Sequence, residues 1–104
     1  MSAGANPLRG EAELRVDGQG LVLRPSFAAL VAAEEELGPL FALVERAADG
    51  RLRLDELAAL FWHCVRDRPP ALTRAAVGEA VVAQGLAGVT PALRVLLGQI
   101  LQGR

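Results

Sequence analysis

The dipeptide Asp17-Gly18 constrains the fold more than any other feature, because it stands between two short segments in which apolar and polar residues alternate. A type I′ turn needs positive φ at both central positions, and Asp-Gly is typical of such turns. The pattern therefore predicts a β-hairpin over residues 11–24. The residues predicted to share its buried face are Ala12, Leu14, Val16, Leu21 and Leu23.

Two registers fit this hairpin. A two-residue turn at residues 17–18 places Leu14 opposite Leu21 and Glu11 opposite Arg24. A four-residue turn over residues 17–20 shifts the pairing by two. Both registers keep the same face inside, because side chains alternate with a period of two along a strand. The pattern determines the buried face and leaves the register open.

Two helices are predicted directly after the hairpin. Ser26 is a suitable N-cap for the first, which ends at Gly38, and Pro39 opens the second, which ends near Gly50. The residues predicted to face the core from the first helix are Phe27, Leu30, Val31 and Leu37.

Three more helices are predicted towards the C-terminus. The third covers residues 54–66 and ends before a pair of prolines. Thr73 caps the fourth, which Gly85 and Gly88 interrupt, and the dipeptide Thr90-Pro91 begins the last. The apolar positions of each recur at helical spacing, so each helix presents one face to a common core.

These elements predict an α+β fold, with one N-terminal hairpin followed by about five short helices in a compact bundle. Residues 1–8 are predicted to be a loose N-terminus and residues 9–104 a single domain, with the hairpin at 11–24 and the helical region at 26–102. A chain of 104 residues buries roughly two-thirds of its unfolded surface, which is enough for one core. A lone hairpin is marginal in water, so its apolar face must lie on the helices or on another chain.

The composition and charge of the chain indicate its cellular location and argue against some classes of partner. The net charge of −1 gives no general attraction to nucleic acid or to an anionic membrane. No uninterrupted apolar run approaches the roughly 18 residues of a membrane span, and residues 1–10 lack the apolar centre of a signal peptide. The lone Cys64 agrees with the cytoplasmic location that these features predict. All 11 basic residues are Arg, which is typical of a GC-rich bacterium.

Catalytic and metal-binding residue sets are missing from the sequence. His63 and Cys64 are adjacent, so on a helix they point about 100° apart and do not converge on one metal or substrate. No second His or Cys completes a zinc site. We therefore predict no enzymatic activity, no metal and no cofactor, with Cys64 buried and His63 at the boundary of the core.

Residues 45–56 have the length of an EF-hand calcium loop. Gly50 occupies loop position six and Glu56 position twelve, as the motif requires. Positions three and nine are Ala47 and Arg53, where oxygen ligands or a bridging water are needed. The segment matches the framework of the loop better than its ligands, so a plain corner between two helices is the favoured interpretation.

The segment GVTPA at residues 88–92 is similar to the turn of a helix-turn-helix DNA-binding protein. A recognition helix needs outward polar and cationic side chains. The helix that follows offers Arg94 and Gln99 among many Leu and Val residues. It is typical of a core helix, so nucleic acid is not the expected partner, and DNA binding stays an alternative.

A run of motifs resembles one protein family. N-P-x-R-G-E precedes the first strand, D-G forms the turn, L-R ends the second strand, and F-A-A-L and E-E-L-G follow. In this order and spacing they resemble the small tail-assembly proteins of gene transfer agents and related prophages, of the tail assembly chaperone type. The residues that carry the resemblance are Asn6, Pro7, Arg9, Gly10, Glu11, Asp17, Gly18, Leu23, Arg24, Phe27, Ala28, Ala29, Leu30, Glu36, Leu37 and Gly38.

The resemblance implies a non-enzymatic role in building a phage-like tail. Such chaperones keep the long tape-measure protein soluble and recruit tail-tube subunits to it. Family members are also labelled tail tube proteins, so a structural place in the tube is an alternative. A cytoplasmic location, a place in a phage-like particle and homo-oligomers are all compatible with these roles.

The hairpin and a neighbouring helix groove are the predicted partner surface, because hairpin edges can accept further strands. Charged residues on the outward face of the hairpin would select the partner. The acidic run on the first helix is chiefly a solvated face and offers a second docking surface. The predicted partner-binding residues are Arg9, Glu11, Arg15, Arg24, Glu34 and Glu35.

Overall fold

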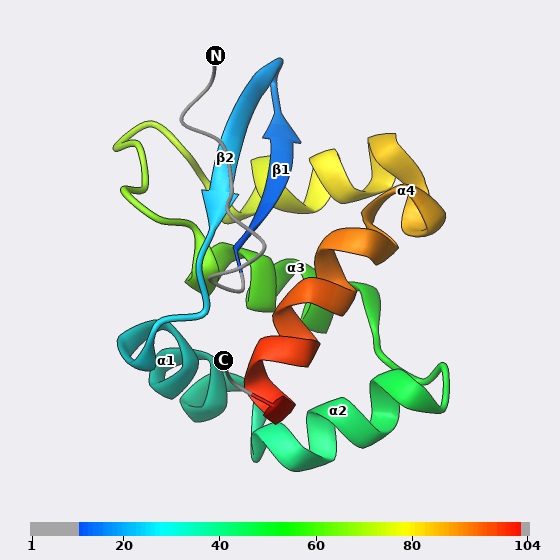
Figure 1. Cartoon of the computed structure of the whole chain (residues 1–104). Helices are drawn as coiled ribbons and strands as arrows, with labels where there is room; N and C mark the ends of the chain where they lie inside the picture. The colour runs from blue at the N-terminus through cyan, green and yellow to red at the C-terminus, as the bar shows by residue number, and fades with distance from the viewer. Residues whose placement is uncertain (1–10, 103–104) are drawn as a thin grey trace.

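The computed structural model describes residues 11–102 and shows an α+β architecture there, which confirms the predicted fold class. Strands β1 (Ala12–Val16) and β2 (Gln19–Leu23) form an antiparallel hairpin, and four helices follow. In Figure 1 the hairpin lies above, helix α3 lies in the middle, and helices α1 and α2 lie below. The prediction for residues 1–8 falls outside the described residues.

The hairpin has the two-residue turn. Val16 pairs with Gln19 and Leu14 with Leu21, which resolves the register in favour of the shorter loop. Both turn residues have positive φ, with 52° at Asp17 and 78° at Gly18. All five side chains predicted to face inward are buried.

Helix α3 (Leu54–Cys64) ends two residues earlier than predicted, because the chain leaves it to pair with β2. The amide of Arg24 donates to the carbonyl of Cys64 at 2.6 Å, and the amide of Arg66 donates to the carbonyl of Val22 at 2.8 Å. Leu23 and Val65 form an antiparallel bridge between these bonds. Residues 64–66 therefore cover the outer edge of β2 and tie the hairpin to the end of α3.

Helices α1 (Phe27–Leu37) and α2 (Leu40–Ala48) begin as predicted, and the Ser26 hydroxyl accepts from the amide of Ala29 at 3.2 Å. The predicted buried face of α1 is wrong in part. Phe27 is 85% exposed and Val31 is 38% exposed, while Ala33 is fully buried. The small residues Ala29 and Ala33 let α1 approach the core closely, and this rotation turns its bulkiest residue outward.

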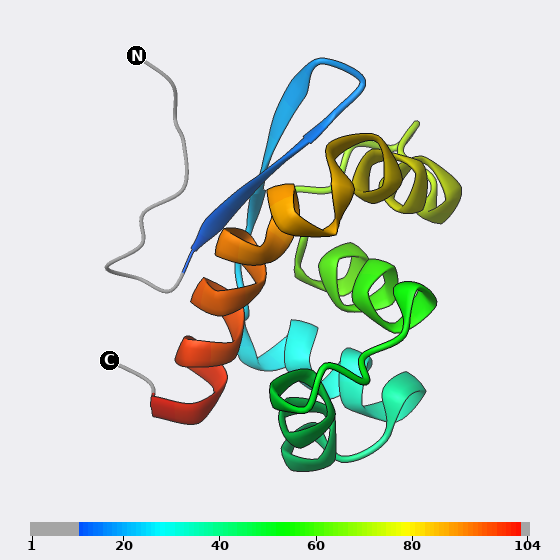
Figure 2. The same cartoon turned by 90° about the vertical axis from the view of Figure 1, so that its right-hand side faces the viewer.

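Helix α4 (Arg74–Gln102) combines the fourth and fifth predicted helices, so the described residues hold four helices. Gly85 interrupts it with φ 81° and ψ 156°, a conformation that favours glycine. The second segment resumes at once, so Gly88 and Pro91 lie inside it and the predicted start at Thr90 is wrong. Figures 1 and 2 show α4 bending sharply, with its second segment returning across α3 towards α2.

One hydrophobic core joins both strands and all four helices. Its largest fully buried side chain is Phe61 of α3, and the hairpin contributes Leu14 and Leu23. Val81 and Leu96 come from the two segments of α4, so the bend at Gly85 allows one helix to cover the core from two directions.

Helix α4 is long and apolar enough to cross a membrane by length and composition alone. The sequence analysis predicted no such span, because no uninterrupted apolar run approaches the roughly 18 residues that a span requires. The helix is also broken at Gly85, and residues of both segments pack into the core. This bend disrupts the continuous backbone hydrogen bonding that a span of about 20 residues requires.

Candidate partner-binding surface

Glu11 is not an outward-facing hairpin residue, which corrects the sequence prediction. It is 2% exposed, and its carboxylate lies 3.7 Å from Nε of Arg24 and 3.4 Å from Nη1 of Arg66. The bridge between β2 and residues 64–66 brings Arg66 to this position. Glu11 and Arg24 therefore help to join the hairpin to the end of α3. Arg9 lies outside the described residues.

Arg15 is exposed beside the turn of the hairpin. Its guanidinium donates to the carbonyl of Gly18 at 2.8 Å, and its own carbonyl accepts from Nε2 of Gln84 at 2.8 Å. A groove of about 550 Å³ separates this end of the hairpin from the first segment of α4. Its lining residues are Arg15, Asp17, Gly18, Ala76, Glu79, Ala80, Ala83 and Gln84.

The edges of the hairpin are less open than the sequence suggested. Residues 64–66 hydrogen-bond to the edge of β2 at Val22 and Arg24. On the β1 side the Gln84 side chain donates a hydrogen bond to the carbonyl of Arg15. Covering a sheet edge with a helix or loop is a common protection against unwanted strand addition. A partner is therefore more readily accommodated by the groove and the exposed side chains than by the backbone of these edges.

The acidic run on α1 divides into three roles. Glu34 accepts from the amide of Leu40 at 3.1 Å and so caps α2. Glu35 is exposed and makes no hydrogen bond or ion pair within residues 11–102. Glu36 belongs to a cluster that ties three helices together. Because α1 lies at the end of the molecule away from the hairpin turn, Glu34 and Glu35 do not join Arg15 in one site (Figure 1).

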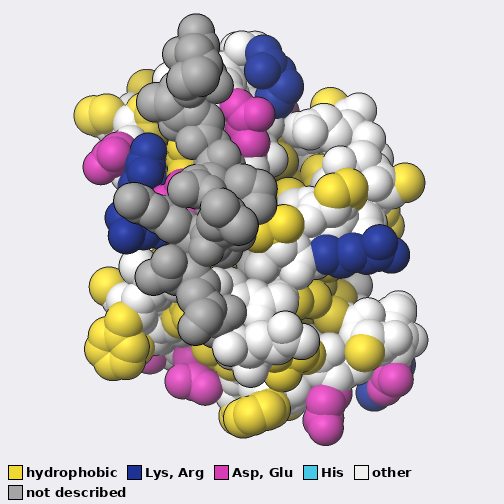
Figure 3. All heavy atoms as spheres, in the orientation of Figure 1, with side chains coloured by type: hydrophobic (Ala, Val, Ile, Leu, Met, Phe, Trp, Pro, Cys, Tyr) yellow, Lys and Arg dark blue, Asp and Glu magenta, His cyan; other side chains and the backbone are white. Residues whose placement is uncertain are grey.

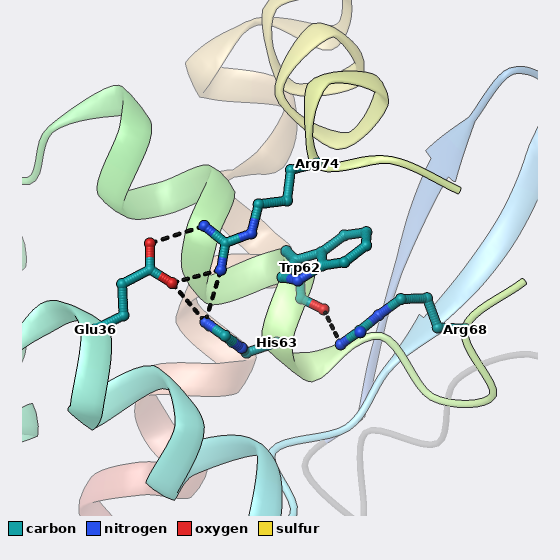
Figure 4. Close-up of polar contacts among 5 residues, drawn as sticks. All are labelled: Glu36, Trp62, His63, Arg68 and Arg74. Atoms are coloured by element: carbon teal, nitrogen blue, oxygen red, sulfur yellow. Dashed lines mark hydrogen bonds and ion pairs between the residues drawn. The ribbon is translucent and has the colours of Figure 1, made fainter. Parts of the chain in front are cut away.

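The cluster around Glu36 is shown in Figure 4. Its Oε1 lies 2.8 Å from Nε2 of His63 on α3, and its Oε2 accepts from Arg74 on α4 at 2.8 Å. The hydrogen bonds from Arg74 and then His63 lower the pKa of Glu36 to about 2. Sequence reasoning missed this cluster, because its three residues lie on separate elements and no local pattern relates them.

Arg68 lies over the ring of Trp62, with its guanidinium carbon 4.0 Å from the ring centroid (Figure 4). It also donates to the carbonyl of Trp62 at 3.1 Å. The predicted burial of Cys64 is confirmed, and this burial raises the pKa of the thiol to about 12. A thiol that stays protonated at neutral pH is a poor nucleophile.

The segment similar to a calcium loop forms a corner between α2 and α3. Glu56 at its last position accepts from the amide of Arg53 at 2.9 Å and pairs with Arg46. Its carboxylate is thus occupied by protein groups. Within the described residues no three His, Cys, Asp or Glu side chains are grouped to hold a metal ion. The GVTPA segment lies inside the second segment of α4, so it is not a turn between two helices.

Large apolar side chains are exposed at several places on the helices. Figure 3 shows hydrophobic side chains at the surface over α1 and α2. A second, open groove of about 840 Å³ lies between the start of α3 and the first segment of α4. The most exposed large apolar side chains are Phe27, Phe41, Leu54, Val82, Leu86 and Leu101. The sequence analysis assigned Phe27 to the core, so its exposure corrects that prediction.

Comparison with known protein families identifies the family of this chain. A family model described as phage tail tube protein, GTA-gp10, matches residues 9–103. The chain belongs to this GTA-gp10 family. Comparisons with curated proteins and with solved structures found no match.

Membership of the GTA-gp10 family confirms the resemblance drawn from the N-terminal motifs. The match extends from the residues before the hairpin to the end of α4, so the hairpin, the α4 groove and the exposed helix faces are all parts of the family domain. The chain thus belongs to a family of phage tail proteins, and the surfaces described above are its candidate contacts with other tail proteins.

Proposed function

We propose that this GTA-gp10 family member is an assembly protein of a phage-like tail. It acts as a chaperone that binds tape-measure and tail-tube proteins in the cytoplasm, where the tail is built. The proposal involves no catalytic step and no cofactor.

The small extent of the sheet is the observation that supports this proposal most. Within residues 11–102 the sheet has two strands of five residues each. A wall built by closing sheets into a ring needs many more strands, about eight for the smallest closed barrels. The helical body with exposed apolar side chains suits a protein that binds partners better than a subunit that forms a continuous wall.

The hairpin–α4 groove is the partner surface that we favour. It combines an exposed cation, Arg15, with the carboxylates of Asp17 and Glu79 and with a floor of alanines. An extended or helical segment of a tail protein can place small side chains on this floor. Its charged residues can then pair with the rim, and such rim charges influence partner choice more than affinity.

The test is co-expression with the cognate tape-measure protein, followed by size exclusion with light scattering. A co-eluting complex of defined mass is expected. Arg15→Glu should weaken it, because a rim cation becomes an anion beside Asp17 and Glu79. Arg94→Glu is the matched control, since Arg94 is exposed on the second segment of α4 and makes no ion pair within the described residues.

Arg24 is unsuitable for the same test. A glutamate there would face the buried carboxylate of Glu11, so the variant would report on folding. If the wild-type chain does not bind the tape measure, the chaperone role is wrong. If Arg15→Glu binds as well as wild type, the role stands and this groove is not its site.

The alternative role, a structural place in the tail tube, is favoured by the family description. The two roles differ in whether the protein remains in the finished particle. Quantitative mass spectrometry of purified particles distinguishes them. A copy number comparable with that of the tube subunit would replace the chaperone proposal, whereas absence or trace amounts would support it.

A further inference from the structure

Helix α1 presents an exposed ridge that nothing in residues 11–102 covers. Phe27, Val31 and Glu35 are four residues apart in sequence, so they share one face of the helix. Phe27 is 85% exposed and Val31 is 38% exposed. We call Phe27, Val31 and Glu35 the α1 ridge. Its apolar part lies towards the start of the helix and its unpaired carboxylate towards the end.

A groove of complementary character lies elsewhere on the same molecule. Its walls are Leu54 of α3 and Val82 of α4, which are 47% and 64% exposed. The rest of its apolar lining is made of small residues, which we call its floor. The residues that define this α3–α4 groove are Arg53, Leu54, Asp55, Ala58, Ala75, Gly78, Glu79 and Val82.

The two surfaces lie on different sides of the molecule. Figure 1 shows α1 at the lower left, and Figure 2 shows the start of α3 beneath the first segment of α4 on the opposite side. The ridge of one copy therefore cannot fill its own groove. A second copy can supply the missing half to each.

We propose that the α1 ridge of one copy docks into the α3–α4 groove of a second copy, head to tail. Phe27 and Val31 enter between Leu54 and Val82 and come to rest on the alanine and glycine floor. Such docking of a helix into an apolar groove is a common mode of recognition.

The pairing of Glu35 with Arg53 supports a second copy as the occupant; the other charged residues of the groove lining, Asp55 and Glu79, are acidic. Glu35 has no partner within the described residues, and Arg53 stands at the α3 end of the groove. Arg53 lies 3.3 Å from Asp55, but both side chains are about three-quarters exposed. Exposed pairs of this kind are weak. Arg53 can therefore exchange Asp55 for Glu35 of the docked copy.

A head-to-tail contact leaves a free groove at one end of a pair and a free ridge at the other. Repetition of the contact gives a closed ring or an open filament, unlike the closed dimer of a two-fold contact. An array of this kind would present many copies of the surface with which each chain binds other tail proteins.

The test is sedimentation equilibrium of the full chain over a range of concentrations. Wild-type mass should rise with concentration. Phe27→Asp and Val82→Asp should each weaken association about tenfold or more, because each places a charge in an apolar contact. Leu101→Asp is the matched control, an exposed leucine at the end of α4 outside both surfaces. Its association should equal that of wild type.

Mixing the two impaired variants is the decisive step. The Phe27→Asp chain retains an intact groove and the Val82→Asp chain an intact ridge, so the mixture should form a one-to-one pair that stops there. A wild-type mass that stays that of the monomer at every concentration would overturn the proposal. So would a mixture that remains monomeric, or loss of association in the Leu101→Asp variant. Binding to the tape measure is not part of this test, so its outcome is independent of the chaperone role.

Discussion

The hairpin and helix α1 are neighbours in sequence, and each has a clear apolar pattern. They differ in how many of the side chains predicted to face the core are buried. Every apolar side chain predicted to face inward from the hairpin is buried. In α1 only Ala33 is fully buried, and Phe27 at its start is almost fully exposed. Side-chain size therefore does not determine which residues of this chain carry the core.

The difference follows from the periods of the two elements. A strand has two faces, and an alternating pattern places all its apolar residues on one of them. Burying the other face would expose every apolar residue, so the pattern determines which face is buried. A helix rich in alanine has several faces of similar polarity, and its rotation is decided by how closely it can approach its neighbour. In α1 the alanines permit the closer approach, so Phe27 and Val31 remain outside while Leu30 and Leu37 pack at the margin of the core.

The largest predicted effect tests this contrast directly. Leu23→Ala should lower the free energy of unfolding by about 2–5 kcal/mol, because it empties a fully buried position between the sheet and the helices. Phe27→Ala removes a larger side chain, but it should change the free energy of unfolding by only about 0.5 kcal/mol or less. Urea unfolding at low protein concentration measures both. A larger loss from Phe27→Ala would show that α1 packs with its predicted face.

A substitution at the bend of α4 sharpens the comparison. Gly85→Ala should cost about 1–3 kcal/mol, because its φ of 81° and ψ of 156° strain any residue with a Cβ atom. The bend also positions Gln84, which holds the β1 side of the hairpin. Loss of stability should therefore come with weaker hydrogen-exchange protection in β1 than in α1.

Gly98→Ala is the control for this substitution. Gly98 lies in the second segment of α4, and a Cβ added there would meet nothing within 4 Å. Alanine should stabilise the helix by up to about 1 kcal/mol, since glycine is the poorer helix former. Equal effects at the two positions would mean that the bend is not a strained conformation.

The sequence predicted the local features of the fold well. The hairpin turn, the buried face of the hairpin and the caps Ser26 and Thr73 all depend on residues close together in the chain. The end of α3 was wrong by two residues because pairing with β2, about 40 residues earlier, competes with the helix. The break at Gly85 was predicted, but the immediate return of the helix was not.

The candidate surface was harder to predict, because its geometry depends on distant contacts. The sequence predicted that Glu11 faces outward. In the structure its carboxylate pairs with Arg66, which the pairing of residues 64–66 with β2 places beside it. Glu36 was one of three similar glutamates, and only folding distinguishes it from Glu35 by placing His63 and Arg74 around it. Among the predicted partner residues within 11–102, Arg15 is the one that lines a described groove.

The smallest predicted effect concerns how α1 is attached, since two of its large apolar residues, Phe27 and Val31, are exposed and do not attach it. The pKa of Glu36 is lowered to about 2 in the folded chain, chiefly by Arg74, from an ordinary value of 4.5. A lowered folded pKa means that the ionised carboxylate stabilises the fold above pH 4.5 and that this contribution is lost as the pH falls towards 2. Exposed ion pairs contribute about 1 kcal/mol or less, so the effect should be modest.

Comparison of Glu36→Gln with wild type isolates this contribution from the other carboxylates, which titrate in the same range. Urea unfolding between pH 6 and pH 2 should show Glu36→Gln less stable at pH 6, with the gap closing as the pH falls. Glu35→Gln, one residue away and without a partner in the described residues, should show no gap at any pH. A gap for Glu36→Gln that stays constant with pH would mean that Arg74 does not hold this carboxylate ionised. The attachment of α1 would then depend on Ala33 and its apolar neighbours alone.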